Sequence, residues 1–180
     1  MNKKVFWQNI ECSGREYLTL KKENSSLIGR ASVLWGAKEA SERLSYIFKM
    51  DEGWTIQKVN IYLHNKELNL ASNGKGKWTS GGEVLVEGEG TIDIDLSVTP
   101  FSNSLPINRF SWKEGQSRTF PVLYVDGLSL EVKKLEQQYT YLGKFLHVRR
   151  FEYKCRDYRT TITVDSDGLV VNYPGVFTRK

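Results

Sequence analysis

Hydrophobic residues occupy every second position along much of this chain. In segment 91–98 the aliphatic residues alternate strictly with threonine, aspartate and serine, and segments 54–63 and 159–164 show the same period. Because the side chains of a strand point alternately to opposite faces, this pattern predicts β-strands. Further short strands are predicted at 84–86, 120–125, 128–132, 145–155 and 169–173.

Turn-forming residues separate the predicted strands. They are 73–76 (Asn-Gly-Lys-Gly), 80–82 (Ser-Gly-Gly), 126–127 (Asp-Gly) and 165–168 (Asp-Ser-Asp-Gly). Many short strands without long helices between them are typical of an antiparallel sheet that curls or closes. No repeat or linker divides the chain, so we expect a mainly β protein with minor α content, folded as a single domain over residues 1–180.

Two segments fit both periods. Ala37, Ala40, Leu44, Ile47 and Phe48 fit a helix, but 44–50 alternate like a strand, and we expect a strand with a short helix before it. In the second segment, Val132, Leu135, Tyr139 and Leu142 have the spacing of one helical face, and Gly143 follows them. Glycine commonly ends helices, so this pattern predicts a helix over 132–142.

The composition is that of a soluble globular domain. The chain has 180 residues, of which 39% are hydrophobic and 26% charged, and no apolar run reaches the length of a membrane span. The N-terminus lacks the apolar region of a signal peptide, so we expect a cytoplasmic protein. Cys12 and Cys155 stand far apart without metal-ligand spacing, and we expect both to be free thiols.

The charge distribution and the motifs of the chain disfavour nucleic-acid binding, metal binding and several kinds of catalysis. The net charge of +5 is spread over both halves of the chain without a basic arm, which favours a solvated surface over a nucleic-acid interface. His64 and His147 are the only histidines, and neither has a second ligand at metal-binding spacing. Neither a nucleophile elbow nor a phosphate-binding loop is present, so we expect no metal, no cofactor and no nucleic-acid partner.

Asp93 and Asp95 are the strongest candidates for chemistry. They lie two residues apart on one predicted strand, so their side chains share a face. Three interpretations follow: a polar face wetted by solvent, an acid/base pair of a carbohydrate-active enzyme, or acceptors for sugar hydroxyls in a cavity. The five tryptophans could line such a cavity, but each fits the core better.

The segment after these aspartates predicts a stiff polar loop. Pro100 and Pro106 disfavour helix at the residues before them, Thr99 and Leu105, so we expect extended chain on both sides of a turn at 102–104. Asn103 and Arg109 then become candidate ligand donors at a cavity mouth. The alternative is a turn that only connects two strands.

Several of these motifs together resemble a known family. Asp93-Ile-Asp-Ile, 99–109 (Thr-Pro-Phe-Ser-Asn-Ser-Leu-Pro-Ile-Asn-Arg) and the closing segment 165–179 are similar to the signatures of a bacterial family described as putative glycolipid-binding. The motifs 46–54, 76–78 and 137–140 occur in the family's order. Asn108 and Gln138 depart from it, since the family often carries arginine at both positions.

The resemblance implies about a dozen antiparallel strands with one or two helices, curled into an open or half barrel around a cavity. It also implies a non-enzymatic protein that binds an amphipathic ligand, such as a glycolipid or another lipid. A carbohydrate-active enzyme and a protein-interaction module with a filled core remain the alternatives.

From the residues and motifs together we assign six ligand-binding candidates: Asp93, Asp95, Asn103, Arg109, Tyr139 and Tyr173. If the two aspartates face the interior, each needs a partner, because an unpaired buried charge is costly. Arg109 is the nearest arginine in sequence. We therefore predict that it pairs with Asp93 or Asp95 on a returning strand, and that Asn103 lies at the cavity rim.

Overall fold

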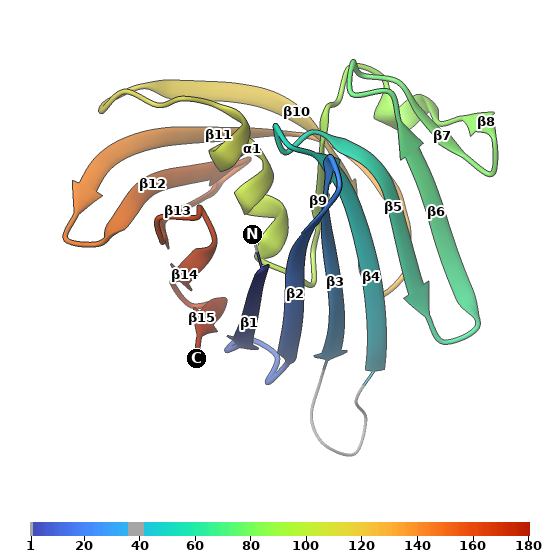
Figure 1. The fold of residues 1–180 in the computed structure, drawn as a ribbon, viewed down its shortest axis with the longest axis horizontal. Coiled ribbons are helices and arrows are strands. Elements are labelled where there is room, and N and C mark those ends of the chain that lie inside the picture. The colour runs from blue at the N-terminus through green and yellow to red at the C-terminus, as the bar shows by residue number, and fades with distance from the viewer. Residues whose placement is uncertain (1, 36–41) are drawn as a thin grey trace.

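The protein forms one large curled β-sheet. A computed structural model describes residues 2–35 and 42–180, and Figure 1 shows their arrangement. In these residues 15 strands form one sheet in the order β8-β7-β6-β5-β4-β3-β2-β1-β15-β14-β13-β12-β11-β10-β9. The two edge strands, β8 and β9, are not paired with each other in the described chain, so the sheet curls but stays open. The predicted mainly β fold is confirmed.

The strands are short and follow one another along the chain. Their bounds are β1 (Asn2–Asn9), β2 (Arg15–Glu23), β3 (Ser26–Trp35), β4 (Glu42–Asp51), β5 (Ile56–Leu63), β6 (Lys66–Ser72), β7 (Trp78–Ser80), β8 (Glu83–Val84), β9 (Asp93–Leu96), β10 (Ser117–Val125), β11 (Val132–Phe145), β12 (Val148–Cys155), β13 (Tyr158–Val164), β14 (Val170–Tyr173) and β15 (Phe177–Arg179). Three short helices accompany them: the 3-10 turns η1 (Val86–Gly88) and η2 (Phe101–Asn103), and the helix α1 (Ser104–Arg109).

The two ends of the chain meet in the middle of the sheet. β1 pairs antiparallel with β15, which joins a meander of β1–β8 to a second meander of β10–β15. The buried indole of Trp7 on β1 donates a hydrogen bond to the carbonyl of Val170 on β14, at 2.8 Å. Non-local contacts of this kind join the two halves of the sheet.

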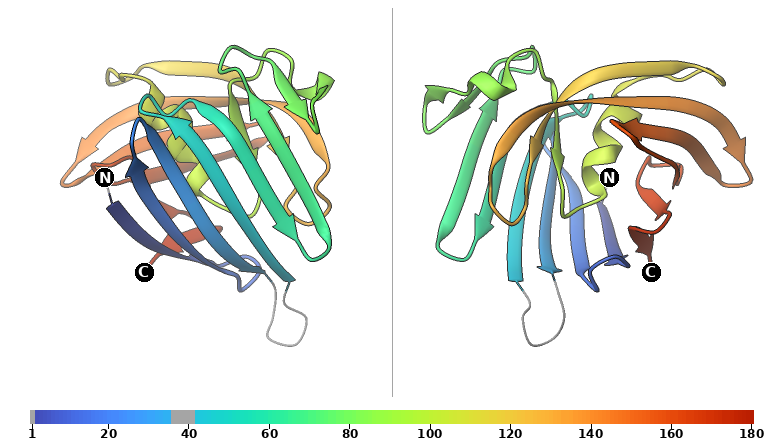
Figure 2. Two further views of the ribbon diagram at one scale, coloured as in Figure 1. Left: turned by 45° about the vertical axis from the view of Figure 1, so that its right-hand side comes forward. Right: turned by 180° about the vertical axis from the view of Figure 1, so that it is seen from behind.

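β9 breaks the antiparallel pattern. It pairs parallel with β10, and a parallel pair needs a crossover rather than a hairpin. The connection from β9 to β10 runs over residues 97–116 and contains η2 and α1. We use the name crossover segment for residues 93–109, which comprise β9, η2 and α1. In Figures 1 and 2 α1 lies inside the curve of the sheet, with β1–β4 on one side and β10–β12 on the other.

The crossover segment fills the concave side of the sheet. Phe101 on η2 is fully buried, and its ring centroid lies 6.4 Å from that of Tyr46 and 5.9 Å from that of Phe48 on β4. A Cβ at Gly29 on β3 would lie 2.9 Å from the Phe101 ring, so only glycine lets the ring approach this strand. Apolar residues of β9 and α1 belong to the same core: Ile94, Leu96, Leu105 and Ile107. Both faces of β9 are therefore covered.

The prediction of extended chain on both sides of a turn at 102–104 is wrong. Leu105 and Pro106 lie in α1, and the chain becomes extended only at Phe110. Proline is tolerated in the first turn of a helix because the N–H groups there have no intrahelical acceptor. The preference of Leu105 for extended backbone is a bias, and burial of Leu105 and Ile107 in the core outweighs it.

The helix predicted over 132–142 is also wrong. These residues form β11, which pairs with β10 on one side and β12 on the other. The register shifts between Tyr141 and Gly143, and Gly143 has a φ of +100° at this bulge. The helix-like spacing arises because apolar residues lie on both faces of β11: Tyr139 is buried, whereas Leu142 is 41% exposed.

Three further predictions concern residues 44–50, the segment before them and residues 128–132. The strand over 44–50 is confirmed within β4, where Leu44, Tyr46, Phe48 and Met50 are buried. The short helix expected before this strand, near Ala37 and Ala40, lies outside the described residues. Residues 128–131 form a turn before β11 rather than a strand.

Both cysteines are free thiols, as predicted. Across residues 2–35 and 42–180, no helix has both the length and the apolar character to cross a membrane.

Candidate functional site

Four of the six candidate residues lie on the crossover segment. Asp93 and Asp95 are on β9, Asn103 ends η2 and Arg109 ends α1. Because η2 and α1 turn the chain back toward β9, residues from both ends of the segment meet inside the curled sheet.

Asp93 and Arg109 form an ion pair, which confirms the predicted pairing. The Arg109 guanidinium donates from Nη2 to Oδ2 of Asp93 and from Nε to Oδ1, the latter at 3.3 Å. The side chain of Asp93 is 1% exposed and that of Arg109 is 14% exposed. Burial raises the pKa of Asp93, and the guanidinium opposes that rise. The route differs from the prediction, because Arg109 arrives on a helix and not on a returning strand.

Asp95 is held by neutral donors. The hydroxyl of Ser102 donates to Oδ1 at 2.9 Å, and the amide of Gln137 on β11 donates to Oδ2 at 2.6 Å. Burial raises the pKa of Asp95, and these two hydrogen bonds lower it in part. Next to it, the hydroxyl of Tyr139 donates to Oδ1 of Asn103 at 2.7 Å. The orientations of Asp95 and Asn103 are thus fixed before any ligand binds.

A cavity of about 220 Å³ opens beside these two side chains, and we call it the polar cavity. Its wall combines carboxylate, amide and hydroxyl groups with three tyrosines and two apolar residues. The lining residues are Asp95, Ser97, Thr99, Asn103, Tyr124, Tyr153, Tyr173, Val176 and Phe177.

The six candidate residues differ in how they lie relative to this cavity. Asp95, Asn103 and Tyr173 line it, and Tyr139 lies behind Asn103. Asn103 was expected at the rim; it does line the cavity, and it is itself buried. Asp93 and Arg109 stand outside the lining and brace the segment that carries it. The aromatic lining comes from tyrosines and Phe177, whereas Trp7, Trp54 and Trp78 are buried in the core.

A third buried acid, Glu16, lies one residue behind the polar cavity. Its Oε1 accepts hydrogen bonds from the hydroxyl of Tyr46 at 2.5 Å and from the hydroxyl of Thr99 at 2.8 Å. Its Oε2 is buried without a partner among the described residues, and no ion pair to Glu16 is found there. Burial raises the pKa of Glu16 to about 8. A neutral carboxylic acid at this site therefore links β2, β4 and the crossover segment.

Sequence reasoning missed Glu16, although a signal was present. In segment 15–20, Glu16 has the same parity as Leu18 and Leu20, so it occupies the apolar face of its strand. An acid on a buried face needs hydrogen-bond donors, and Thr99 supplies one from far along the chain. Gln137 was also missed as a partner of Asp95, although it shares a face with Tyr139.

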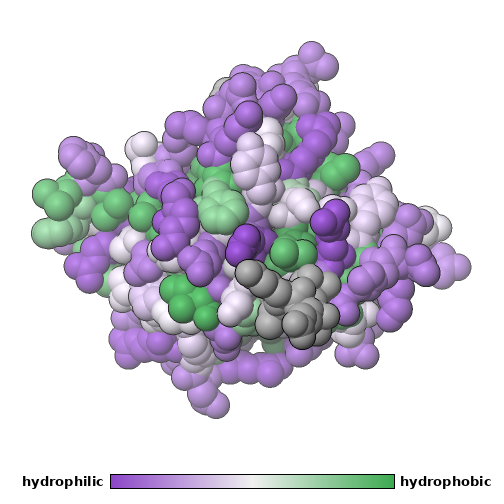
Figure 3. Space-filling model, turned by 90° about the horizontal axis from the view of Figure 1, so that it is seen from below, coloured by the Kyte–Doolittle hydropathy of each residue, from purple (hydrophilic) through white to green (hydrophobic). Residues whose placement is uncertain are grey.

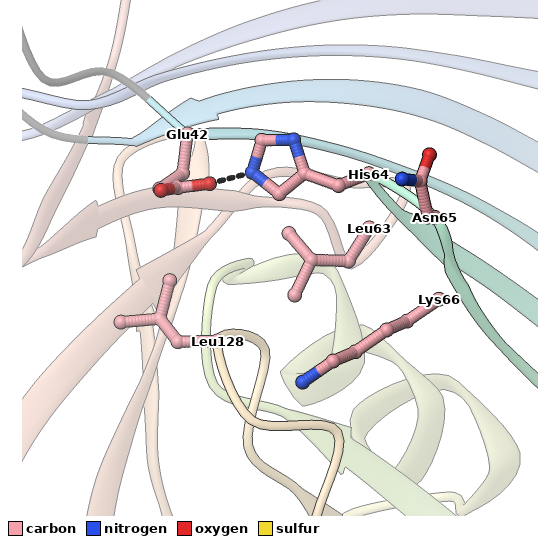
Figure 4. Close-up of a pocket in the computed structure, with 6 residues that line it drawn as sticks. All are labelled: Glu42, Leu63, His64, Asn65, Lys66 and Leu128. Carbon is pink, nitrogen blue, oxygen red and sulfur yellow. Dashed lines mark hydrogen bonds and ion pairs between the residues drawn. The ribbon is translucent and has the colours of Figure 1, made fainter.

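A second cavity, of about 380 Å³, lies at the rim of the sheet (Figure 4). It is lined by Glu42, Leu63, His64, Asn65, Lys66 and Leu128. Nε2 of His64 contacts the Glu42 carboxylate, and both side chains are about half exposed. Exposed side chains at strand ends are poorly fixed, so this rim cavity is a weaker candidate for specific recognition than the polar cavity. No group of three metal-ligating side chains occurs in the part of the chain described.

Asn108 and Gln138, which depart from the family pattern, have structural partners. Asn108 donates to the carbonyl of Asp167 at 2.9 Å and accepts from Arg149 at 3.3 Å. Gln138 lies on the surface and donates to the Thr119 hydroxyl at 3.2 Å. Neither residue lines the polar cavity.

Together these features define a class of protein: an open curled β-sheet whose concave side holds a helical segment and a small polar cavity. Residues 4–179 match the family described as putative glycolipid-binding, and the chain belongs to this family. A similar solved structure is the crystal structure, at 1.80 Å resolution, of a DUF1089 family protein from Pseudomonas aeruginosa. It has a TM-score of 0.76 and 26% sequence identity, and the match covers 92% of each chain. Among curated proteins, none matches this chain.

Replacing Arg109 by alanine should destabilise the protein in the absence of any ligand. The change leaves the Asp93 carboxylate buried without its cation, which typically costs about 3–5 kcal/mol. Urea unfolding at neutral pH measures the loss. The matched control is Arg159→Ala, which removes an exposed ion pair of 2.7 Å to Glu152 and should leave the stability nearly unchanged. An Arg109→Ala variant as stable as the wild type would contradict the structural role of the pair.

Glu16 should make the protein less stable as the pH rises. Its folded-state pKa of about 8 exceeds the ordinary value of 4.5, so the folded state holds a proton that the unfolded state has lost. The free energy of unfolding then falls between these two pH values, by at most about 5 kcal/mol. Glu16→Gln cannot ionise and should be more stable than the wild type at pH 8. Asp93 and Asp95 titrate in both proteins, so the difference between the two pH profiles isolates Glu16; identical profiles would show that Glu16 is not buried as a neutral acid.

Proposed function

We propose that the polar cavity binds the hydroxyl-rich headgroup of an amphipathic ligand, such as a glycolipid, without chemical turnover. The observation that carries this proposal is the lining itself, in which Asp95 and Asn103 stand in fixed orientations beside Tyr153 and Tyr173. Carboxylate and amide groups bind hydroxyls, and tyrosine rings offer flat faces with a polar tip for sugar rings. The family description agrees with this chemistry.

The volume of the polar cavity limits the size of the ligand that it can bind. Pockets for drug-sized ligands have about 300–1,000 Å³, whereas the polar cavity has about 220 Å³. It therefore suits a headgroup rather than a whole lipid. Val176 and Phe177 in the lining offer an apolar side where the first carbons of a chain would lie.

A binding role fits the carboxylates better than hydrolysis does. A glycosidase needs two carboxyl groups on opposite sides of the scissile bond. Here Asp95 is the only carboxylate among the lining residues, and Asp93 is occupied by Arg109. The cytoplasmic location expected from the sequence remains part of this proposal.

The filled concave side supports a second candidate function. The crossover segment occupies the space where a half barrel would hold a lipid chain, and its residues belong to one continuous core. A protein-interaction module with a filled core would look the same inside. The two candidates differ in one observable, which is the presence of a small ligand.

Binding of an alkyl glycoside tests the proposal. Titration with octyl glucoside below its micelle concentration should give saturable heat in a calorimeter, while an octyl chain with a zwitterionic headgroup should give none. Asp95→Asn keeps the shape but removes the charge-assisted hydrogen bond, so affinity should fall by at least about tenfold. The matched control is Asp157→Asn on the exposed β12–β13 turn, which should bind like the wild type.

Three outcomes would overturn the proposal. Equal affinities of the Asp95→Asn variant and the wild type would place any binding elsewhere. Release of free glucose during the titration would indicate an enzyme. No glycoside binding, together with no bound lipid in native mass spectrometry of the purified protein, would favour the interaction module.

A further inference from the structure

The β11–β12 hairpin carries an unusual tip. β11 continues past the start of β10, so residues 142–148 extend beyond the neighbouring strand. Figure 1 shows this hairpin projecting at one end of the molecule. Phe145 is 62% exposed and Leu146 is 75% exposed, with Leu142 beside them. Figure 3 shows hydrophobic atoms gathered at this end among hydrophilic surroundings.

Leu146 also has an unusual backbone conformation. Leu146 has a φ of +54°, in the left-handed region that leucine disfavours. The corresponding first residue of three other hairpin turns, with φ between +51° and +54°, is polar: Asn24, His64 and Arg156. Folding alone favours a polar residue or glycine at such a position. The stability of the fold therefore does not explain the apolar side chain of Leu146.

Basic residues surround the apolar tip. Lys144 and Arg149 stand directly opposite each other across the hairpin, and Arg150 follows. Like charges in this arrangement repel each other. Lys144 has no ion-pair partner in the described residues, whereas Arg149 donates to Asn108 and lies over the Phe151 ring. Two acids lie near the hairpin: Glu114, which lies against Gly143, and Asp165, whose charge acts on Arg149. The three cations outnumber them, so the tip keeps a net positive charge.

We propose that the β11–β12 tip docks on an anionic lipid surface. Phe145 and Leu146 enter the boundary between headgroups and acyl chains, and the exposed Lys144 and Arg150 contact the lipid phosphates. The surface relieves both anomalies, because it buries the exposed apolar side chains and neutralises the facing cations. This inference uses no residue of the polar cavity, so it stands or falls separately from the proposed function.

The opposite end of the molecule offers a matched comparison. Val84 and Val86 near β8 are 78% and 72% exposed, as much as the residues of the β11–β12 tip. Their neighbours Glu83, Glu87 and Glu89 are acidic. An anionic surface should repel this end, so apolar exposure alone does not predict docking there.

Vesicle sedimentation tests the proposal. The wild-type protein should sediment with vesicles of equimolar phosphatidylcholine and phosphatidylglycerol, and at least tenfold less with phosphatidylcholine alone. Lys144→Gln/Arg150→Gln should weaken partitioning about 30-fold, from about 1 kcal/mol for each charge. Phe145→Ser/Leu146→Asn should also abolish most binding, whereas Val84→Ser/Val86→Ser should bind like the wild type. Circular dichroism confirms that each variant is folded.

Four results would overturn it. They are no sedimentation of the wild type, equal sedimentation with both kinds of vesicle, and equal losses in the tip variant and the Val84/Val86 variant. The fourth is self-association in ultracentrifugation that the tip variant abolishes while vesicle binding is absent, which would make the tip an interface between copies of the chain.

Discussion

The ion pair between Asp93 and Arg109 fixes the two ends of the crossover segment to each other. Asp93 begins β9 and Arg109 ends α1, so the pair closes this segment on itself inside the curled sheet. A sheet that curls without closing needs something to cover its concave apolar face. Here the chain supplies the cover from its own middle, and Phe101, Leu105 and Ile107 complete the core.

The polar cavity is a consequence of this arrangement. Because the cover is a segment with a buried aspartate, a half-buried aspartate and a buried asparagine, polar groups are carried into the interior, where each needs a partner. Ser102, Gln137 and Tyr139 satisfy Asp95 and Asn103, and the cavity opens where those polar side chains face the tyrosines. Glu16 extends the polar interior to β2, and one of its carboxyl oxygens has no partner among residues 2–35 and 42–180. The same network therefore holds the fold together and shapes the candidate site.

The alternation of the chain predicted β4, β5, β9, β10, β12, β13 and β14, because it records which side chains face the core, whereas β1–β3, β6, β7 and β15 were not predicted. It failed at 132–142, where apolar residues lie on both faces of β11, and at Leu105, where a local preference met a tertiary demand. The pairing of Asp93 with Arg109 could be predicted, since a buried carboxylate needs a cation and Arg109 is close in sequence. Glu16 and Gln137 could not be assigned in the same way, because their partners Thr99 and Asp95 lie 83 and 42 residues away. Only the folded topology brings them together.

Residues 93–109 are part of the core and not a loop laid over it. Native-state hydrogen exchange of backbone amides measures the opening free energy of each segment. We expect the protected amides of β9 and α1 to exchange as slowly as those of β3 and β4, through global unfolding. Fast exchange in β9 and α1 while β3 and β4 stay protected would show that the segment opens independently, and it would contradict a preformed polar cavity.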